Sequence, residues 1–176
     1  MLVELVYSLN AGLEDGTIGL NAQFDTLSVV SGHAVPPDVT FYNQIEHKWV
    51  ARRKVTTEDT GVSYPAVAIF QSAPGSVDGE VETIVRDGDW PITFAYLAKR
   101  SDSALGARDG GYTMRCLPRF LRDYMENSNV AARTVNGIIV SQIIGDLQVP
   151  PILEEWDKAE IVAALTATFR CRETSP

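Results

Sequence analysis

The stretch IVAALTATFRC, from Ile161 to Cys171, carries the clearest structural signal in the chain. Its residues alternate between two faces. Because successive side chains of a β-strand point to opposite sides, this period of two predicts a strand with one buried face. The buried face is expected to carry Ile161, Ala163, Leu165, Ala167, Phe169 and Cys171, and the opposite face Thr166, Thr168, Arg170 and Arg172.

A hairpin is expected to join the same sheet. Glu80–Arg86 alternates in the same way, and Ile92–Lys99 is a second apolar stretch. Between them, Asp87-Gly88-Asp89 is typical of a tight turn, because glycine tolerates the positive φ that such turns need. Glu80–Lys99 is therefore predicted to form an antiparallel hairpin. Two further strands are expected at Tyr64–Gln71 and Val135–Asp146.

Two helices stand out by their spacing. Apolar residues recur every three or four positions over Leu20–Ser31, and Gly32 ends that pattern. In the second helix the apolar face is opposed by an arginine face. Pro118 either opens this helix in its first turn or kinks a longer one. The apolar face comprises Met114, Leu117, Leu121, Tyr124 and Met125, and the opposite face Arg115, Arg119 and Arg122.

The remaining segments are expected to connect these elements. Leu2–Leu9 is apolar but too short to assign to a helix or a strand. Glycine-rich Asn10–Gly19 and polar Ser101–Gly111, with its Gly110-Gly111 break, indicate loops. Residues 38–60 are predicted to form a long loop, which includes at most a short strand near Trp49.

These elements indicate an α+β fold. About five strands and two main helices do not alternate regularly, which favours a largely antiparallel sheet with the helices packed on one face. The chain has 176 residues, a length that suits one domain. No composition shift, repeat or low-complexity segment divides it, so residues 1–176 are predicted to form a single domain.

Charge and cysteine content narrow the class of protein. The net charge is −8 and the pI is about 4.7. Such a chain repels phosphate backbones, so a basic groove that grips DNA is not expected. Cys116 and Cys171 form no CxxC motif, so a metal framework or a disulfide scaffold is not supported. The sequence leaves open one disulfide between them, but a chain with so few cysteines is expected in a reducing compartment. Met1–Asn10 is a poor signal peptide, and no apolar run is long enough for a membrane span.

No pattern in the sequence indicates catalysis. His33 and His47 lie in expected loops without further metal ligands at suitable spacing. No GxSxG motif and no glycine-rich phosphate loop is present. Asp87-Gly88-Asp89 lacks the additional carboxylates of a calcium loop. We therefore expect a protein that is not an enzyme and needs no metal or cofactor. A small enzyme, or a monomeric binding module, without a recognisable motif remains the alternative.

Two charged surfaces are candidates for interaction. The arginine face of the second helix is either solvated or docks on an acidic surface of a neighbouring copy, where tryptophan and arginine are favoured anchors. A second group surrounds the expected hairpin turn. It is either a solvated edge that blocks strand pairing or a surface that DNA slides past. The acidic docking candidates are Glu154, Glu155, Trp156 and Asp157, and the hairpin group is Glu80, Glu82, Asp87 and Asp89.

The order of the elements resembles a known family. After the first helix come a strand beginning YPAV at Tyr64 and a hairpin ending in ITFAYLAKRSDS at Ser103. The helix GYTMRCLPRFLRDYM, the segment NGIIV and the strand VAALTATFRCRE follow. From about Leu20 to the C-terminus, this order resembles the tail-terminator (tail-completion, or minor tail) proteins of long-tailed bacteriophages.

The resemblance implies a specific structural role. Such proteins form a hexameric ring at the head-proximal end of the tail tube, end its polymerisation and join it to the head connector or stopper protein. The implied location is the neck of the virion, assembled in the host cytoplasm, where DNA passes without specific binding and no membrane is involved. The family is not enzymatic, uses no cofactor and has no catalytic residues to transfer. Another neck component, a head-completion or stopper protein, is the nearest alternative.

Overall fold

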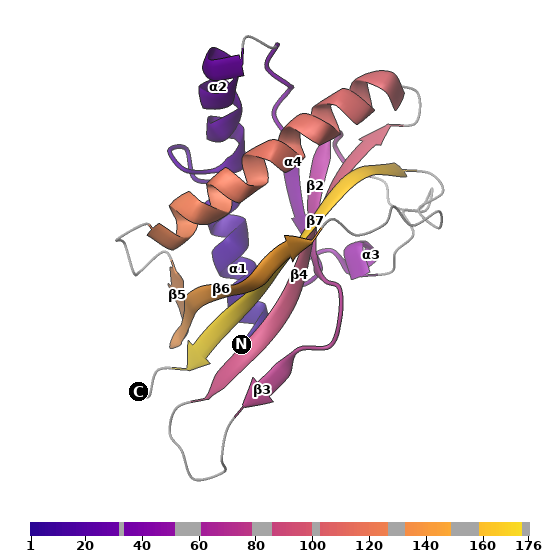
Figure 1. The fold of residues 1–176 in the computed structure, drawn as a ribbon. Helices are drawn as coiled ribbons and strands as arrows, with labels where there is room; N and C mark the ends of the chain where they lie inside the picture. Colours follow the sequence, from indigo (N-terminus) through magenta and orange to yellow (C-terminus); the bar gives the residue numbers. More distant parts are fainter. Residues whose placement is uncertain are drawn as a thin grey trace.

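The computed structural model describes residues 1–31, 34–51, 61–78, 86–99, 103–126, 133–148 and 159–173. Within these residues the chain forms four helices and seven strands (Figure 1). The helices are α1 (Leu2–Leu13), α2 (Leu20–Ser31), α3 (Lys48–Ala51) and α4 (Ser103–Glu126). The strands are β1 (Thr40–Asn43), β2 (Ala66–Gln71), β3 (Ser76–Asp78), β4 (Asp87–Lys99), β5 (Thr134–Val135), β6 (Ile138–Gln148) and β7 (Ala159–Glu173).

The strands form one sheet around a long central pair. Their order is β1-β2-β4-β7-β6-β5, with β3 beside the first part of β4. β4 and β7 pair antiparallel from Asp87 opposite Arg172 to Lys99 opposite Ala159. Among the described pairs only β1 and β2 run parallel. The expected antiparallel sheet is confirmed, and Ile92–Lys99 does pair with the strand that contains Ile161–Cys171.

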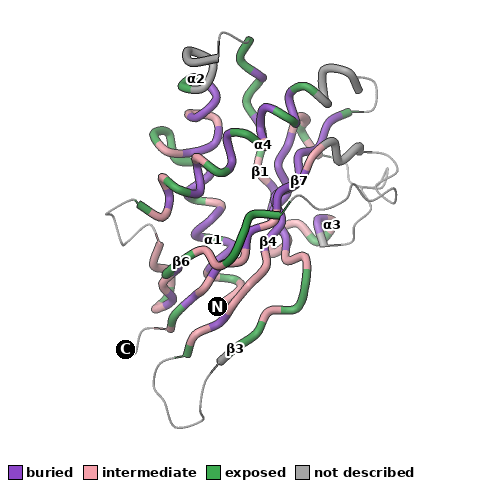
Figure 2. The backbone as a smooth tube through the Cα atoms, in the orientation of Figure 1, coloured by how far each residue is buried: buried purple, intermediate pink, exposed green. Residues whose placement is uncertain are grey.

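Three helices pack on one face of this sheet and enclose the main core (Figures 1 and 2). The central strands contribute alternate residues, and Leu165 is only 5% exposed. The opposite face carries a smaller cluster beneath α3, formed by side chains such as Tyr42, Phe70 and Leu97. The fold is therefore a single α+β domain, as expected, although α1 adds a third helix to the packed face. The main core includes Leu5, Leu9, Phe24, Ile69, Phe94, Tyr96, Leu117, Phe120, Tyr124 and Phe169.

The N-terminal segment is a helix, which corrects the loop expected from Asn10. α1 continues to Leu13, because Leu5, Leu9 and Leu13 bury the same side of the helix against the sheet. The loop begins only after it. There the carboxylate of Asp15 accepts hydrogen bonds from the backbone N–H groups of Thr17 and Ile18, at 2.7 and 3.0 Å.

The expected long loop over residues 38–60 contains two elements. β1 adds to the sheet edge beside β2, where the N–H of Thr40 donates to the carbonyl of Pro65. Trp49 lies in α3, not in a strand. Both elements are held by tertiary contacts that a short polar sequence does not signal, and residues 52–60 lie outside the described residues.

The expected turn at Asp87-Gly88-Asp89 is wrong. These residues begin β4, and β3 pairs with them antiparallel, so the chain reverses between Asp78 and Asp87. Their extended conformation is fixed from the other side by β7, whose Arg172 and Arg170 pair with the two aspartates. Residues 80–85 of the expected first hairpin strand lie outside the described residues.

α4 is longer than expected, and the polar connection Ser101–Gly111 is corrected. The helix begins at Ser103, runs through Gly110-Gly111 and holds Pro118 in its interior. Its packed apolar stripe stabilises the helix against these unfavourable residues, since most helical stability in proteins comes from such packing. The expected strand Val135–Asp146 is also two strands, joined at Asn136 and Gly137. Both have positive φ, as a tight hairpin turn requires.

Candidate interaction surface

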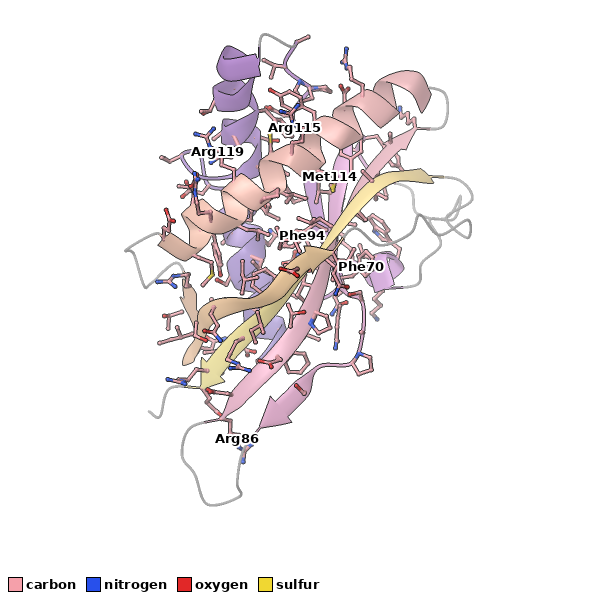
Figure 3. The ribbon with its side chains drawn as sticks, in the orientation of Figure 1. Phe70, Arg86, Phe94, Met114, Arg115 and Arg119 are labelled. Atoms are coloured by element: carbon pink, nitrogen blue, oxygen red, sulfur yellow. The ribbon has the colours of Figure 1, made fainter. Side chains whose placement is uncertain are left out.

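α4 turns its apolar side to the sheet and its arginines away from it. Leu117, Leu121 and Tyr124 are buried, and Met114 and Met125 are partly buried against the core. Figure 3 shows Met114 on the side of α4 toward the sheet and Arg115 and Arg119 along its opposite edge, where α4 runs beside α2. The two-faced helix is therefore confirmed, but its three arginines have different surroundings.

Arg122 is occupied within its own helix. Its guanidinium binds the carboxylate of Asp123 at 3.1 Å and lies 4.0 Å from that of Glu126. The side chain is 59% exposed, so these pairs contribute little stability. They do offset the charge of Arg122 locally, which leaves Arg115 and Arg119 as the cations open to a partner.

Arg115 and Arg119 lie one helical turn apart and form no ion pair among the described residues. Arg115 is exposed. Arg119 is half-buried, and its Nε atom is buried without a hydrogen-bond acceptor in the described part of the chain. A buried donor without an acceptor costs free energy. Because this Nε is buried, an incoming carboxylate would bind the exposed guanidinium of Arg115, with the positive charge of Arg119 one helical turn away.

A hollow of about 350 Å³ lies beside Arg115. Its lining includes Ala34, Gly111 and Tyr112, and the pair formed by Arg108 and Asp109. Arg108 donates to the buried carboxylate of Asp109 at 2.9 Å, so this cation is held by its neighbour. Tyr112 is fixed in the wall by a 3.2 Å hydrogen bond from its hydroxyl to the carbonyl of Phe24. The hollow thus offers an apolar wall next to a free cation.

In the described residues, arginines of β7 pair with the aspartates of the expected acidic patch, so this part of the surface is not acidic. Arg172 binds Asp87 through two hydrogen bonds of 2.9 and 3.0 Å, and Arg170 binds Asp89 through two of 2.8 and 2.9 Å. The hydrogen bonds from Arg172 also hold the pKa of Asp87 below its usual value. These pairs tie β4 to β7. Glu80 and Glu82 lie outside the described residues, as do the docking candidates Glu154, Glu155, Trp156 and Asp157.

The histidines and cysteines form no assembled site in the described residues. His47 packs edge-on against Tyr42 at 4.9 Å between ring centres, and His33 lies outside the described part. Within the same part, no three His, Cys, Asp or Glu side chains are grouped to hold a metal ion. Cys116 and Cys171 are free, buried thiols, and burial raises their pKa values to about 11 and about 12. Neither is therefore activated as a nucleophile.

One surface feature escaped sequence reasoning. Gly145, Asp146 and Leu147 form an exposed irregularity near the end of β6, inside a segment predicted to be a plain strand up to Asp146. In the sequence, only the Gly145-Asp146 pair indicates that the strand is irregular there. Among the described helices, none is long and apolar enough to cross a membrane.

No protein-family model matches the sequence, and no curated protein is similar enough to be matched.

Proposed function

We propose that this chain is a non-enzymatic subunit of a phage neck, which assembles into a ring at the head-proximal end of a tail tube. The observation that carries the proposal is the pair Arg115 and Arg119 on α4. In a chain of net charge −8, two guanidiniums that have no ion-pair partner in the described part of the chain, on a firmly packed helix, are suited to receive an acidic neighbour. The resemblance to tail terminators supplies the identity of the assembly and the number of six copies.

A ring of identical copies requires two different surfaces on each copy. Such a heterologous contact closes into a ring when the rotation between neighbours is suitable. The arginine pair would be one of these surfaces and an acidic surface of the next copy the other. Exposed ion pairs contribute about 0–1 kcal/mol each. The pair would therefore set the register and partner choice, and apolar contacts would supply most of the affinity.

The partners in this proposal are other copies of the chain, the tail tube protein and the head connector or stopper. DNA would pass through the ring without specific binding. A net negative charge suits that passage, because tight binding to DNA depends on cations that displace the counterions of its phosphates. Neither a metal nor a cofactor has a role in this function.

The test is tail-tube capping observed by negative-stain electron microscopy with purified tube protein. Wild-type protein is expected to form rings at tube ends and to stop tube growth. The variant Arg115→Glu with Arg119→Glu is expected to fold but to cap few tubes, because both guanidiniums are replaced by carboxylates.

The matched control is Lys48→Glu with Lys99→Glu. Both lysines are exposed, form no ion pair among the described residues and belong to α3 and β4, not to α4. The control changes the net charge equally but keeps the arginine pair, so it should still cap tubes. Equal capping by the arginine variant would remove the proposed contact. A wild-type protein that binds the connector but never a tube would be a stopper, and one that binds neither would end the proposal.

A further inference from the structure

The pairing of β6 with β7 is interrupted by a bulge. Ile144 lies opposite Thr168 and Gln148 lies opposite Thr166, so three residues of β6 correspond to the single Ala167 of β7. Gly145 begins this bulge with a φ of +69°, and a Cβ there would meet nothing within 4 Å. Glycine is thus suited here by its backbone conformation and not by crowding.

The bulge directs an acidic and an apolar side chain into solvent. Asp146 is exposed and has no hydrogen bond or ion pair among the described residues. Leu147 is 37% exposed, one of the few large apolar side chains at the described surface. Figure 2 shows this end of β6 exposed, in contrast to the buried centres of β4 and β7. Bulges commonly re-aim side chains at sheet edges and next to functional sites.

We infer that the β6 bulge, Gly145–Leu147, is the acidic half of the copy-to-copy contact and is received by Arg115 and Arg119 of a second copy. The inference rests on the proposed ring function. The carboxylate of Asp146 would bind the exposed guanidinium of Arg115 and lie close to the half-buried side chain of Arg119 one turn further along the helix. Leu147 would pack in the hollow beside Tyr112. An acidic group next to an apolar one thus meets a cationic group next to an apolar wall.

The other described carboxylates fit this role less well. Most already have a partner within their own copy. Asp25 and Asp38 are exposed, but they belong to α2 and the segment that follows it, which flank the arginine pair and the hollow in the same copy. Glu173, at the end of β7, is only half-exposed. A ring contact needs two separate surfaces, which the β6 bulge provides. The partnered carboxylates are Glu4, Glu14, Asp15, Glu46, Asp87, Asp89, Asp109, Asp123 and Glu126.

A charge swap tests this contact directly. Arg115→Asp and Asp146→Arg should each weaken self-association about tenfold, because each places like charges in contact. The two changes combined in one chain should restore most of the loss, because the pair is then re-formed with reversed polarity. Association would be measured by sedimentation, in solution or on tube ends, wherever the wild type assembles. Lys48→Asp is the matched control for Arg115→Asp, because it makes the same charge change at an exposed side chain on α3, and it should leave association unaltered.

Thiol cross-linking tests the geometry independently. Copies bearing only Arg115→Cys are mixed with copies bearing only Asp146→Cys and treated with a short bis-maleimide. Mixed dimers should form, whereas neither variant alone should cross-link through this contact, since it joins two different surfaces. The native Cys116 and Cys171 are buried and should not compete.

The possible results separate the inference from the proposed function. Rescue by the swap together with mixed cross-links supports the inference. If Arg115→Asp weakens assembly while Asp146→Arg does not, the acidic partner lies elsewhere, and the inference fails while the ring proposal stands. If wild-type protein assembles neither in solution nor on tubes, the proposed function fails and the inference fails with it.

Discussion

Trp90 leaves no room for a side chain at residue 75. A Cβ on Gly75 would overlap Cε3 of the indole ring, and a Cβ on Gly88 would come within 2.9 Å of its Nε1. The ring is thus held between two glycines and has little freedom to move away. Overpacking of this kind typically costs 1–3 kcal/mol.

We therefore expect Gly75→Ala to lower the free energy of unfolding by about 1–3 kcal/mol in urea denaturation. Gly16→Ala is the matched control, because a Cβ at Gly16 meets nothing within 4 Å. The control should change stability by less than about 0.5 kcal/mol. Equal stabilities for the two variants would show that Trp90 is not confined in this way.

Asp15 links stability to pH. Hydrogen bonds from the N–H groups of Ile18 and Thr17 lower the pKa of its carboxyl group in the folded chain. A group whose folded pKa is lowered contributes stability above its unfolded pKa, and this is lost as the pH falls through the folded value. Glu4, beside the terminal ammonium group, and Asp87, beside Arg172, act in the same direction.

The melting temperature should therefore fall as the pH drops below about 4, the ordinary range of these carboxyl groups. Asp15→Asn should melt at a lower temperature than wild type at pH 7, and the difference should shrink toward pH 2. The measurement is a series of calorimetric scans across this range. A difference that stays constant with pH would mean that the charge of Asp15 does not stabilise the turn between α1 and α2.

At the scale of elements, α4 contains a glycine that its packing does not need. Gly111 lies inside the helix and is exposed, and a Cβ there meets nothing within 4 Å. Glycine in a helix interior is about 1 kcal/mol less favourable than alanine. Gly111→Ala should therefore raise the free energy of unfolding by roughly that amount. An unchanged or lower value in equilibrium unfolding would indicate that this part of α4 is not helical in solution.

The elements that sequence reasoning identified are those whose own pattern matches their surroundings. α2 has the bounds expected from its apolar spacing, and β7 alternates as expected from Ala163 to Cys171, because one of its faces lies on the core there. Between Ile161 and Ala163 a register shift against β4 interrupts the expected alternation. The sequence does not indicate β1 and α3, because pairing with β2 and packing in the smaller cluster stabilise them. Sequence does not indicate the early part of α4, because Gly110-Gly111 locally disfavours a helix, and the packing of the buried face that continues from Tyr112 outweighs that preference.

The sequence predicts one part of the candidate site, the arginine face, but not the pairing of its charged side chains. The arginine face of α4 follows from helical spacing alone, so Arg115, Arg119 and Arg122 could be grouped in advance. Sequence could not show that Arg122 is neutralised by Asp123, or that Asp87 and Asp89 are paired with β7. Those pairings depend on side-chain conformation and strand register. The exposure of Asp146 depends on a bulge, which arises from the pairing of two distant segments.

At the scale of the whole molecule, the proposed ring would have to form despite the like charge of its copies. Each carries −8, so approaching copies repel over a distance set by ionic strength. That distance is about 30 Å at 0.01 M salt, about 8 Å at 0.15 M and about 3 Å at 1 M. A direct contact between a carboxylate and Arg115 or Arg119 is shorter than the first two lengths. Moderate salt therefore screens the repulsion while leaving the contact largely intact.

Self-association should accordingly strengthen from 0.01 M to 0.15 M salt and weaken again toward 1 M, as measured by light scattering. Arg115→Glu with Arg119→Glu changes the net charge by −4, from −8 to −12, and replaces the attractive contact by repulsion, so it should associate more weakly than wild type at every salt concentration. Lys48→Glu with Lys99→Glu reaches the same −12 but keeps the contact. It should associate weakly at 0.01 M and recover at 0.15 M, because only its long-range repulsion has increased. A wild-type association that falls steadily from the lowest salt would contradict this balance, since it would show that long-range attraction between oppositely charged faces brings the copies together.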